Sequence, residues 1–236
     1  MLPIRDLNPT RITPVITLVL IAANILVFYL VQGRGSPDDQ EAFVYERAAI
    51  ACEVTTGVPL GVDEILADVC IPGAQAPIFP DKNVFVALLT SMFLHGGTAH
   101  LLFNMWFLWI FGNNIEEAFG HLGYLLLYLI GGLAATAAYI VINPEATVPL
   151  VGASGAIAVT MGSYAVLFPT HRVLSFVGWF LVPVPAVVFL IFWFVAQFLV
   201  SGGGVAWEAH VGGFVFGAAV ALLLRSRLMR RVGASI

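Results

Sequence analysis

Long apolar runs separated by short polar segments dominate the chain. A membrane-spanning helix needs roughly 20 consecutive, mostly apolar residues, and several segments come close to or exceed this length. We expect six spanning helices, at residues 14–31, 98–111, 122–142, 153–168, 179–200 and 205–224. The pattern therefore predicts an all-α membrane protein, built as a bundle of six transmembrane helices.

One apolar stretch, residues 84–111, is too long for a single untilted span. Gly96 and Gly97 interrupt it, and Thr98 can cap a new helix. We therefore expect residues 84–94 to form an interfacial or re-entrant segment that precedes the second spanning helix.

The positive charges predict which side the termini face, because short cytoplasmic loops carry an excess of Lys and Arg. With both termini in the cytoplasm, the inner segments hold Arg5, Arg11, Arg172, Arg225, Arg227, Arg230 and Arg231, and the outer segments hold Arg34, Arg47 and Lys82. We expect a short cytoplasmic tail at 1–13, a six-helix membrane domain at 14–224 and a basic cytoplasmic tail at 225–236.

A long outer loop, about residues 32–96, follows the first span. Its polar part is too long for a bare connection, and apolar residues recur at helical spacing over 38–54. We expect a helix at the outer membrane surface there; the alternative is a solvated loop. Cys52 and Cys70 are the only cysteines and both lie in this loop, so an oxidising compartment would let them pair. The alternative is two free thiols.

Composition narrows the class of protein further. Charged residues make up 10% of the chain, against about 25% in soluble domains, so lipid surrounds much of the surface. No basic cluster indicates nucleic-acid binding, and nothing in the sequence indicates a metal or another cofactor. No small-residue cleavage site follows the first apolar run in the usual place, so we expect a retained helix rather than a signal peptide.

Few polar side chains fall inside the predicted spans, and these invite a functional interpretation because they are costly in lipid. They are His100 and Asn104 in the second span, Ser154 in the fourth and His210 in the sixth. At ~1.5 Å rise per residue, His100 lies ~3 Å, Asn104 ~9 Å and His210 ~7–8 Å below the start of its helix, and Ser154 lies in the first turn. This shared depth predicts one cavity that opens to the outer face.

The residue types in this layer fit nucleophilic catalysis. A serine hydroxyl becomes a nucleophile when a base such as His210 accepts its proton. Gly152 and Gly155 leave room beside Ser154 for a substrate carbonyl, and free backbone N–H groups at a helix start favour an oxyanion. His100 and Asn104 share a helix face. No carboxylate lies at this depth, so we expect a dyad. The alternative is helix packing, which also explains the Gly213–Gly217 spacing.

Three motifs resemble those of rhomboid intramembrane serine proteases. Residues 95–104 carry the H-x4-H-x3-N pattern, 152–155 the G-x-S-G pattern and 209–213 the A-H-x-x-G pattern, in the family's order. The resemblance implies that Ser154 is the nucleophile and His210 its base. It implies an oxyanion hole of His100, Asn104 and the Ser154 backbone N–H, with structural support from His95, Gly152, Gly155 and Gly213.

The resemblance implies an endopeptidase that cleaves transmembrane protein substrates in the outer part of the bilayer, without a cofactor. Two features of many members are absent: residues 32–83 lack the Trp-Arg pair, and Ala158 stands where an aromatic residue follows the serine. The short tails favour a prokaryotic cell membrane. In the family the fifth helix, where we place Pro183 and Pro185, borders substrate entry. The alternatives are an inactive rhomboid-like protein that binds or escorts membrane proteins, and a small transporter.

Overall fold

The computed structural model describes residues 1–71, 73, 75–199 and 205–233, and the described chain is mostly helical. The helices are α1 (Val15–Val27, extended by a π-helical turn at Phe28–Gln32), α2 (Pro37–Arg47), α3 (Ala51–Thr56), α4 (Val62–Ala67), α5 (Val84–Thr90, followed by a 3-10 turn at Ser91–Phe93), α6 (Thr98–Phe119), α7 (His121–Ile142), α8 (Ser154–Leu167), α9 (Ala186–Leu199) and α10 (Trp207–Gly233). The strands are β1 (Leu2–Asp6), β2 (Arg172–Val177) and β3 (Phe180–Pro185).

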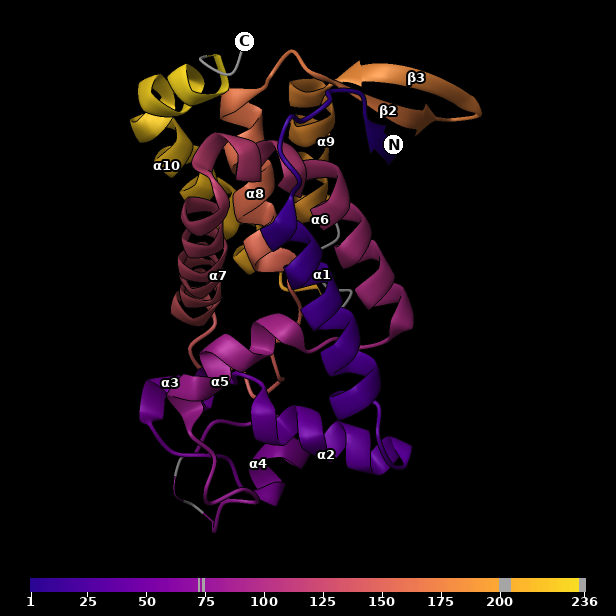
Figure 1. The fold of residues 1–236 in the computed structure, drawn as a ribbon. Helices are drawn as coiled ribbons and strands as arrows, with labels where there is room; N and C mark the ends of the chain where they lie inside the picture. Colours follow the sequence, from indigo (N-terminus) through magenta and orange to yellow (C-terminus); the bar gives the residue numbers. More distant parts are fainter. Residues whose placement is uncertain (72, 74, 200–204, 234–236) are drawn as a thin grey trace.

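Among the described residues, three helices are long and apolar enough to cross a membrane: Val15–Gln32, α7 and α10. A fourth candidate is the bent pair Val84–Phe93 and α6, whose axes meet at 77°. Helices α8 and α9 are apolar but have 14 residues each. Figure 1 shows that α1 and α6 to α10 make up one part of the molecule and that α2 to α5 gather at its opposite end. This is the architecture of a membrane protein.

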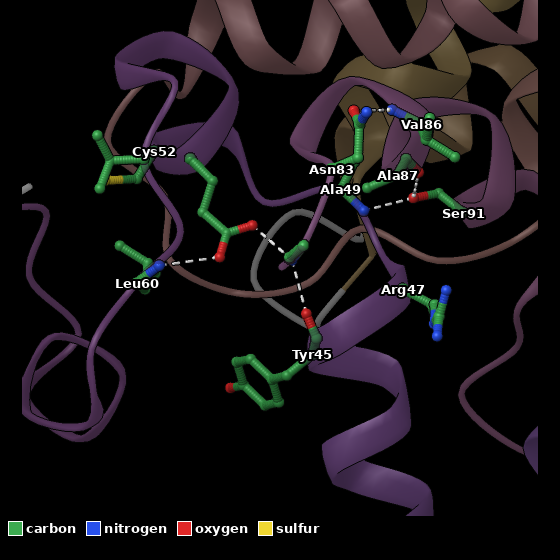
Figure 2. Close-up of polar contacts among 12 residues, drawn as sticks. Tyr45, Arg47, Ala49, Cys52, Leu60, Asn83, Val86, Ala87 and Ser91 are labelled. Atoms are coloured by element: carbon green, nitrogen blue, oxygen red, sulfur yellow. Dashed lines mark hydrogen bonds and ion pairs between the residues drawn. The ribbon is translucent and has the colours of Figure 1, made fainter. Parts of the chain in front are cut away.

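The expected interruption between the interfacial segment and the second span is present. Asn83 caps the start of α5, since its side-chain oxygen accepts hydrogen bonds from the backbone N–H groups of Phe85 and Val86 (Figure 2). The chain turns at Gly96-Gly97, and α6 starts at Thr98. Helix α6 continues to Phe119 rather than ending at Phe111, because its last turns pack in the protein interior, where Ile115 and Ala118 are fully buried.

A three-stranded antiparallel sheet corrects the all-α prediction. The strands lie in the order β1-β2-β3, so the predicted cytoplasmic tail 1–13 contributes an edge strand. The predicted fifth span 179–200 is wrong at its start, since Phe180–Pro185 is strand β3, and its predicted end at Val200 lies outside the described residues. Pro183 and Pro185 therefore precede α9, and an edge strand such as β3 tolerates proline because its outer N–H groups pair with nothing.

The predicted cytoplasmic tail, 225–236, is helical over its described part. Helix α10 continues through Arg225 to Gly233, nine residues past the predicted end of the last span, and 234–236 lie outside the described residues. Leu228 is buried, and the guanidinium of Arg231 donates a hydrogen bond to the carbonyl of Phe119, at 3.1 Å. These contacts attach the end of α10 to the end of α6.

The segment between α1 and α5 is folded, but the single helix expected over 38–54 is broken. Helix α2 ends at Arg47 and α3 begins at Ala51, with Ala48, Ala49 and Ile50 almost fully buried between them. Their extended backbone has other partners: Ala49 pairs with Leu150 in an isolated β-bridge, and its N–H donates to Oγ of Ser91 at 2.5 Å (Figure 2). Tertiary hydrogen bonds thus override the helical pattern.

A disulfide and a buried ion pair hold this segment together. Cys52 and Cys70 are joined across 18 positions of sequence. Nζ of Lys82 lies 2.5 Å from the carboxylate of Glu53 and donates to the carbonyl of Tyr45 at 2.6 Å. The same carboxylate accepts from the N–H of Leu60, a contact visible in Figure 2. Burial lowers the pKa of the Lys82 ammonium, and the Glu53 carboxylate opposes that shift.

Glycines bring the backbones of α8 and α10 into direct contact. A Cβ added at Gly217 would lie 1.9 Å from the carbonyl oxygen of Val159, and one at Gly162 would lie 2.0 Å from that of Phe214. At Gly213 the corresponding distance is 2.4 Å, to the carbonyl oxygen of Gly155. No side chain larger than hydrogen fits at these crossings, so the small-residue spacing at Gly213–Gly217 is a close-packing surface.

We expect Gly217→Ala to destabilise the fold by about 1–3 kcal/mol, because the added methyl group overpacks the α8–α10 contact. The measurement is the unfolding midpoint in detergent. Gly233→Ala is the matched control, since a Cβ there meets nothing within 4 Å on the same helix. Equal midpoints for Gly217→Ala and Gly233→Ala would contradict this packing role.

Candidate active site

Ser154 and His210 meet where two helices begin. Ser154 is the first residue of α8, and His210 lies in the first turn of α10. Nε2 of His210 is 2.8 Å from Oγ of Ser154. The glycine contacts between α8 and α10 therefore bring two residues 56 positions apart into direct hydrogen-bonding range.

The second nitrogen of the His210 ring has a partner that the sequence reasoning missed. Nδ1 lies 2.7 Å from Oε1 of Gln197, in α9. Gln197 in turn donates from Nε2 to the carbonyl of Trp193, at 3.0 Å. A signal was available: Gln197 is the only residue of α9 with a hydrogen-bonding amide or charged side chain, and polar side chains in apolar helices call for a functional interpretation.

An aromatic ring from the same helix lies beside the imidazole. The ring centroids of Trp193 and His210 are 5.9 Å apart at 37°, and Trp193 stacks on Phe214 at 6.1 Å. The sequence predicts no aromatic residue beside His210, because Ala158 occupies the position after the serine where many rhomboid proteases carry one. Helices α9 and α10 supply the ring contacts instead.

His100 lies at the start of α6 and faces the loop before Ser154. Its Nδ1 accepts a hydrogen bond from the N–H of Gly96, at 3.3 Å. In a neutral imidazole one nitrogen accepts and the other donates, so this contact places the hydrogen on Nε2. A Cβ added at Gly152 would lie 3.0 Å from that Nε2 and 3.5 Å from Oγ of Ser154. His100 thus presents a donor on the side where Ser154 lies.

Asn104 lies one turn further along α6 and is 6% exposed. Among the described residues, its Nδ2 is buried and has no hydrogen-bond acceptor. A buried unsatisfied amide costs about 1–3 kcal/mol, so its retention calls for an acceptor supplied from outside the chain. Asn104 lines the same cavity as Ser154 and His210.

A cavity of about 670 Å³ connects these side chains. Its walls are mainly apolar, and the polar side chains on them are Ser91, His100, Asn104, Thr136, Tyr139, Asn143, Ser154, Glu208 and His210, with the indoles of Trp193 and Trp207. Among the described residues, no group of three or more His, Cys, Asp or Glu side chains is arranged to hold a metal ion.

The residues expected to support the site occupy tight positions. His95 is fully buried, and its backbone N–H and carbonyl both bond the side-chain amide of Gln32, at 2.9 and 2.5 Å. Gly152 has φ +124°, which side chains rarely adopt. Gly155 would place a Cβ 2.9 Å from that of Ala135, and Gly213 contacts the Gly155 carbonyl.

The loop before Ser154 is held from the side of the α2–α5 segment. The N–H of Gly152 donates to the carbonyl of Ser91 at 3.0 Å, and the N–H of Leu150 donates to that of Ala49 at 2.8 Å. The N–H of Cys52 donates to the carbonyl of Ala146 at 3.0 Å. The disulfide-bonded segment therefore positions the loop that carries the serine.

Together, the fold and the site define a helical membrane protein with a serine–histidine pair bordering a cavity. The chain belongs to the rhomboid family, because the family model described as Rhomboid domain matches residues 82–227. That range contains Ser154, His210, His100 and Asn104.

Known relatives of the chain come from several kinds of organism. It is 29% identical over 159 residues to Rhomboid protease GluP of Bacillus subtilis, covering 67% of this chain and 26% of the relative. It is 31% identical over 141 residues to the mitochondrial Rhomboid protein 1 of Saccharomyces cerevisiae, covering 56% and 40%. It is 37% identical over 136 residues to Rhomboid-like protease 5 of Toxoplasma gondii, covering 54% and 15%.

The chain thus spans less than half the length of these relatives. Bacterial and mitochondrial proteins both occur among them, so the comparisons do not support the expected prokaryotic origin over an organellar one. They do support membership of a family that includes proteases acting in membranes.

We expect Gly152→Ala to slow the reaction of Ser154 with a fluorophosphonate by about 100-fold, because the methyl group displaces His100 and small misplacements at a reacting centre have effects of that size. Gly57→Ala is the matched control: it also has a positive φ, but its Cβ meets nothing within 4 Å. The rate of labelling in detergent measures both. Similar rates for the two variants would rule out the close approach of Gly152 to His100.

Proposed function

We propose that this protein is an intramembrane serine endopeptidase that cleaves transmembrane protein substrates. The observation that carries the proposal is the 2.8 Å contact between Oγ of Ser154 and Nε2 of His210. A serine hydroxyl is a weak nucleophile until an adjacent base accepts its proton, and His210 is in position to do so. Membership of the rhomboid family supports the same reaction class.

The proposed reaction has two stages. Oγ of Ser154 attacks the scissile carbonyl carbon while Nε2 of His210 takes the hydroxyl proton, and the imidazolium returns that proton to the leaving amine. Water then attacks the acyl-serine ester while Nε2 of His210 takes a proton from it, and the imidazolium returns that proton to Oγ of Ser154 as the carboxyl product leaves. The pair acts as a dyad, with no carboxylate in contact with His210 among the contacts described above.

Candidate donors for the oxyanion line the cavity that Ser154 borders. We assign them to Nε2 of His100, Nδ2 of Asn104 and the backbone N–H of Ser154, which starts α8 and has no acceptor within that helix. Donors fixed in advance stabilise a developing negative charge without reorganisation. The buried and unsatisfied Nδ2 of Asn104 is the strongest support for this role.

For the topology, we propose six membrane crossings with both termini in the cytoplasm and the cavity open to the outer face. Helices α8 and α9 then count as crossings although each is short. Figure 1 supports this arrangement, because β1 and the last turns of α10 lie at one end of the molecule and α2 to α4 at the other. The Arg residues at the end of α10 agree with a cytoplasmic location.

The length of α8 accounts for the position of the serine. Its 14 residues span about 21 Å, against about 30 Å for the hydrocarbon core of a bilayer. A helix that ends at the inner surface therefore begins below the outer surface, and Ser154 lies at that beginning. The cavity gives water a route to this depth.

The substrates we propose are helices of other membrane proteins. The walls of the cavity are mainly apolar, which suits side chains that come from lipid. A helical backbone keeps its carbonyls hydrogen-bonded, so the substrate must unwind locally before Ser154 can reach one. The backbone of the substrate would then exchange its internal hydrogen bonds for those of the oxyanion donors.

Ser154→Ala tests the proposal directly. We expect it to abolish cleavage of a single-span reporter protein in liposomes and to abolish fluorophosphonate labelling, because the acyl-accepting oxygen is gone. His210→Ala is expected to lower both by at least about 100-fold, the usual contribution of a general base. Gel analysis of the reporter and in-gel fluorescence measure the two effects.

The alternative that the test separates is an inactive rhomboid-like protein that binds or escorts membrane proteins. Such a protein would neither cut the reporter nor react with the fluorophosphonate, even as the wild type. Full cleavage by Ser154→Ala would show that another residue is the nucleophile. Either result would end the proposal as stated.

Asn104→Ala is expected to lower kcat by about 10²–10³-fold, as the loss of one oxyanion donor does elsewhere. KM for the reporter should stay within about twofold, since the donor acts on the charge that develops during attack. Leu102→Ala is the control on the same helix, because Leu102 is exposed on its outer face. An unchanged kcat in Asn104→Ala would remove this residue from the oxyanion hole.

A further inference from the structure

Gln197 is an unusual residue for its place in the fold. It lies in α9 among apolar residues, yet it is 9% exposed, whereas Val195 and Phe198 nearby are about half exposed. A buried amide in an apolar environment must have its hydrogen bonds satisfied to be tolerated. Both ends of the Gln197 amide have partners: Nε2 donates to the Trp193 carbonyl and Oε1 lies 2.7 Å from Nδ1 of His210.

The Trp193 contact fixes which end of the amide faces the histidine. A backbone carbonyl only accepts, so the NH₂ group of Gln197 turns toward Trp193 and the oxygen turns toward His210. That oxygen has no hydrogen to donate, so Nδ1 of His210 must carry one. Nε2, the nitrogen next to Oγ of Ser154, is then the nitrogen with the free lone pair.

We propose that Gln197 is a positioning residue that sets the tautomer and the ring orientation of His210. The inference rests on the function proposed above, because it concerns the base of that reaction. Gln197 takes no proton and touches no reacting atom. It holds the imidazole so that the lone pair of Nε2 points at the serine hydroxyl.

Two further contacts restrict the same ring. The indole of Trp193, one turn before Gln197 on α9, lies beside the imidazole, and Phe214 stacks on the same indole. The edge of the His210 ring is therefore held by Gln197 and its face by Trp193. Both come from one turn of α9, so this turn holds the ring at its edge and at its face.

A neutral amide suits this position better than a carboxylate. An ionised side chain at this depth would cost several kcal/mol to bury in the resting protein. The amide oxygen still accepts the Nδ1 hydrogen in both the imidazole and imidazolium forms. Orientation is thus obtained without placing a permanent charge in the apolar layer.

Gln197→Met tests the inference, because methionine has a similar length and lacks the strong acceptor. With a fluorophosphonate as probe, we expect the limiting rate of inactivation, kinact, to fall about 10- to 100-fold, a part of what a general base contributes. KI should stay within about twofold. Gln197→Glu restores an acceptor oxygen and is expected to recover kinact to within about threefold of the wild type, above the rate of Gln197→Met. Val195→Met, on the exposed side of α9, is the matched control and should react like the wild type.

The outcomes separate this inference from the proposed function. Labelling of Ser154→Ala would overturn the proposed function. No labelling of Ser154→Ala together with a wild-type kinact in Gln197→Met would overturn only the positioning role. A raised KI with unchanged kinact, or equally slow Gln197→Met and Gln197→Glu, would also overturn it, since neither result depends on a bond to Nδ1.

A measurement on the wild-type protein covers the case in which Gln197→Met does not fold. In ¹⁵N-histidine-labelled protein, with the His210 signals identified by their loss in His210→Ala, we expect Nδ1 to carry the hydrogen and Nε2 to be unprotonated at neutral pH. The opposite tautomer, or an equal mixture of the two, would overturn the inference without any variant of Gln197.

Discussion

Direct contact between the backbones of α8 and α10 is the constraint on which the rest of the structure depends. Gly162, Gly213 and Gly217 leave no room for side chains at the crossings, so the separation of the two helices is set by main-chain atoms. Because Ser154 and His210 each lie at the start of one of these helices, the same contact sets the distance between the serine hydroxyl and the imidazole. A hydrogen bond of 2.8 Å tolerates little sliding of one helix past the other.

The two-helix contact brings Ser154 and His210 together, and other elements surround the pair. Helix α6 contributes His100 and Asn104 to the same cavity, and α9 contributes Gln197 at the other nitrogen of the imidazole. The α2–α5 segment holds the loop before Ser154 through backbone hydrogen bonds at Ala49 and Ser91. Elements outside the α8–α10 pair therefore complete the site, and the starts of α6, α8 and α10 face a single cavity.

Much of the fold could be predicted from the sequence. The physical reasons for this also explain which predictions were wrong. Apolar length located the starts of α1, α6, α7, α8 and α10 to within a few residues, because lipid makes long apolar runs distinctive. Strand β3 falls in the predicted start of the fifth span, since the apolar residues at 179–185 fit either structure when hydrogen-bond partners are unknown. The break at Ala48–Ile50 depends on Leu150, about a hundred residues away, and no local pattern encodes such a partner. Gln197 could have been predicted, because it is the one amide or charged side chain in the apolar helix α9.

The sheet gives the first residues of the chain a mechanical connection to α9. Strand β1 pairs with β2, β2 pairs with β3, and β3 leads into α9 at Ala186 without an intervening loop. A purification tag or fusion partner joined directly before Leu2 would therefore load strand β1. That load would pass through the sheet to β3, which continues into the helix that carries Trp193 and Gln197. For the design of expression vectors, a flexible spacer at this end is a requirement of the architecture rather than a convenience.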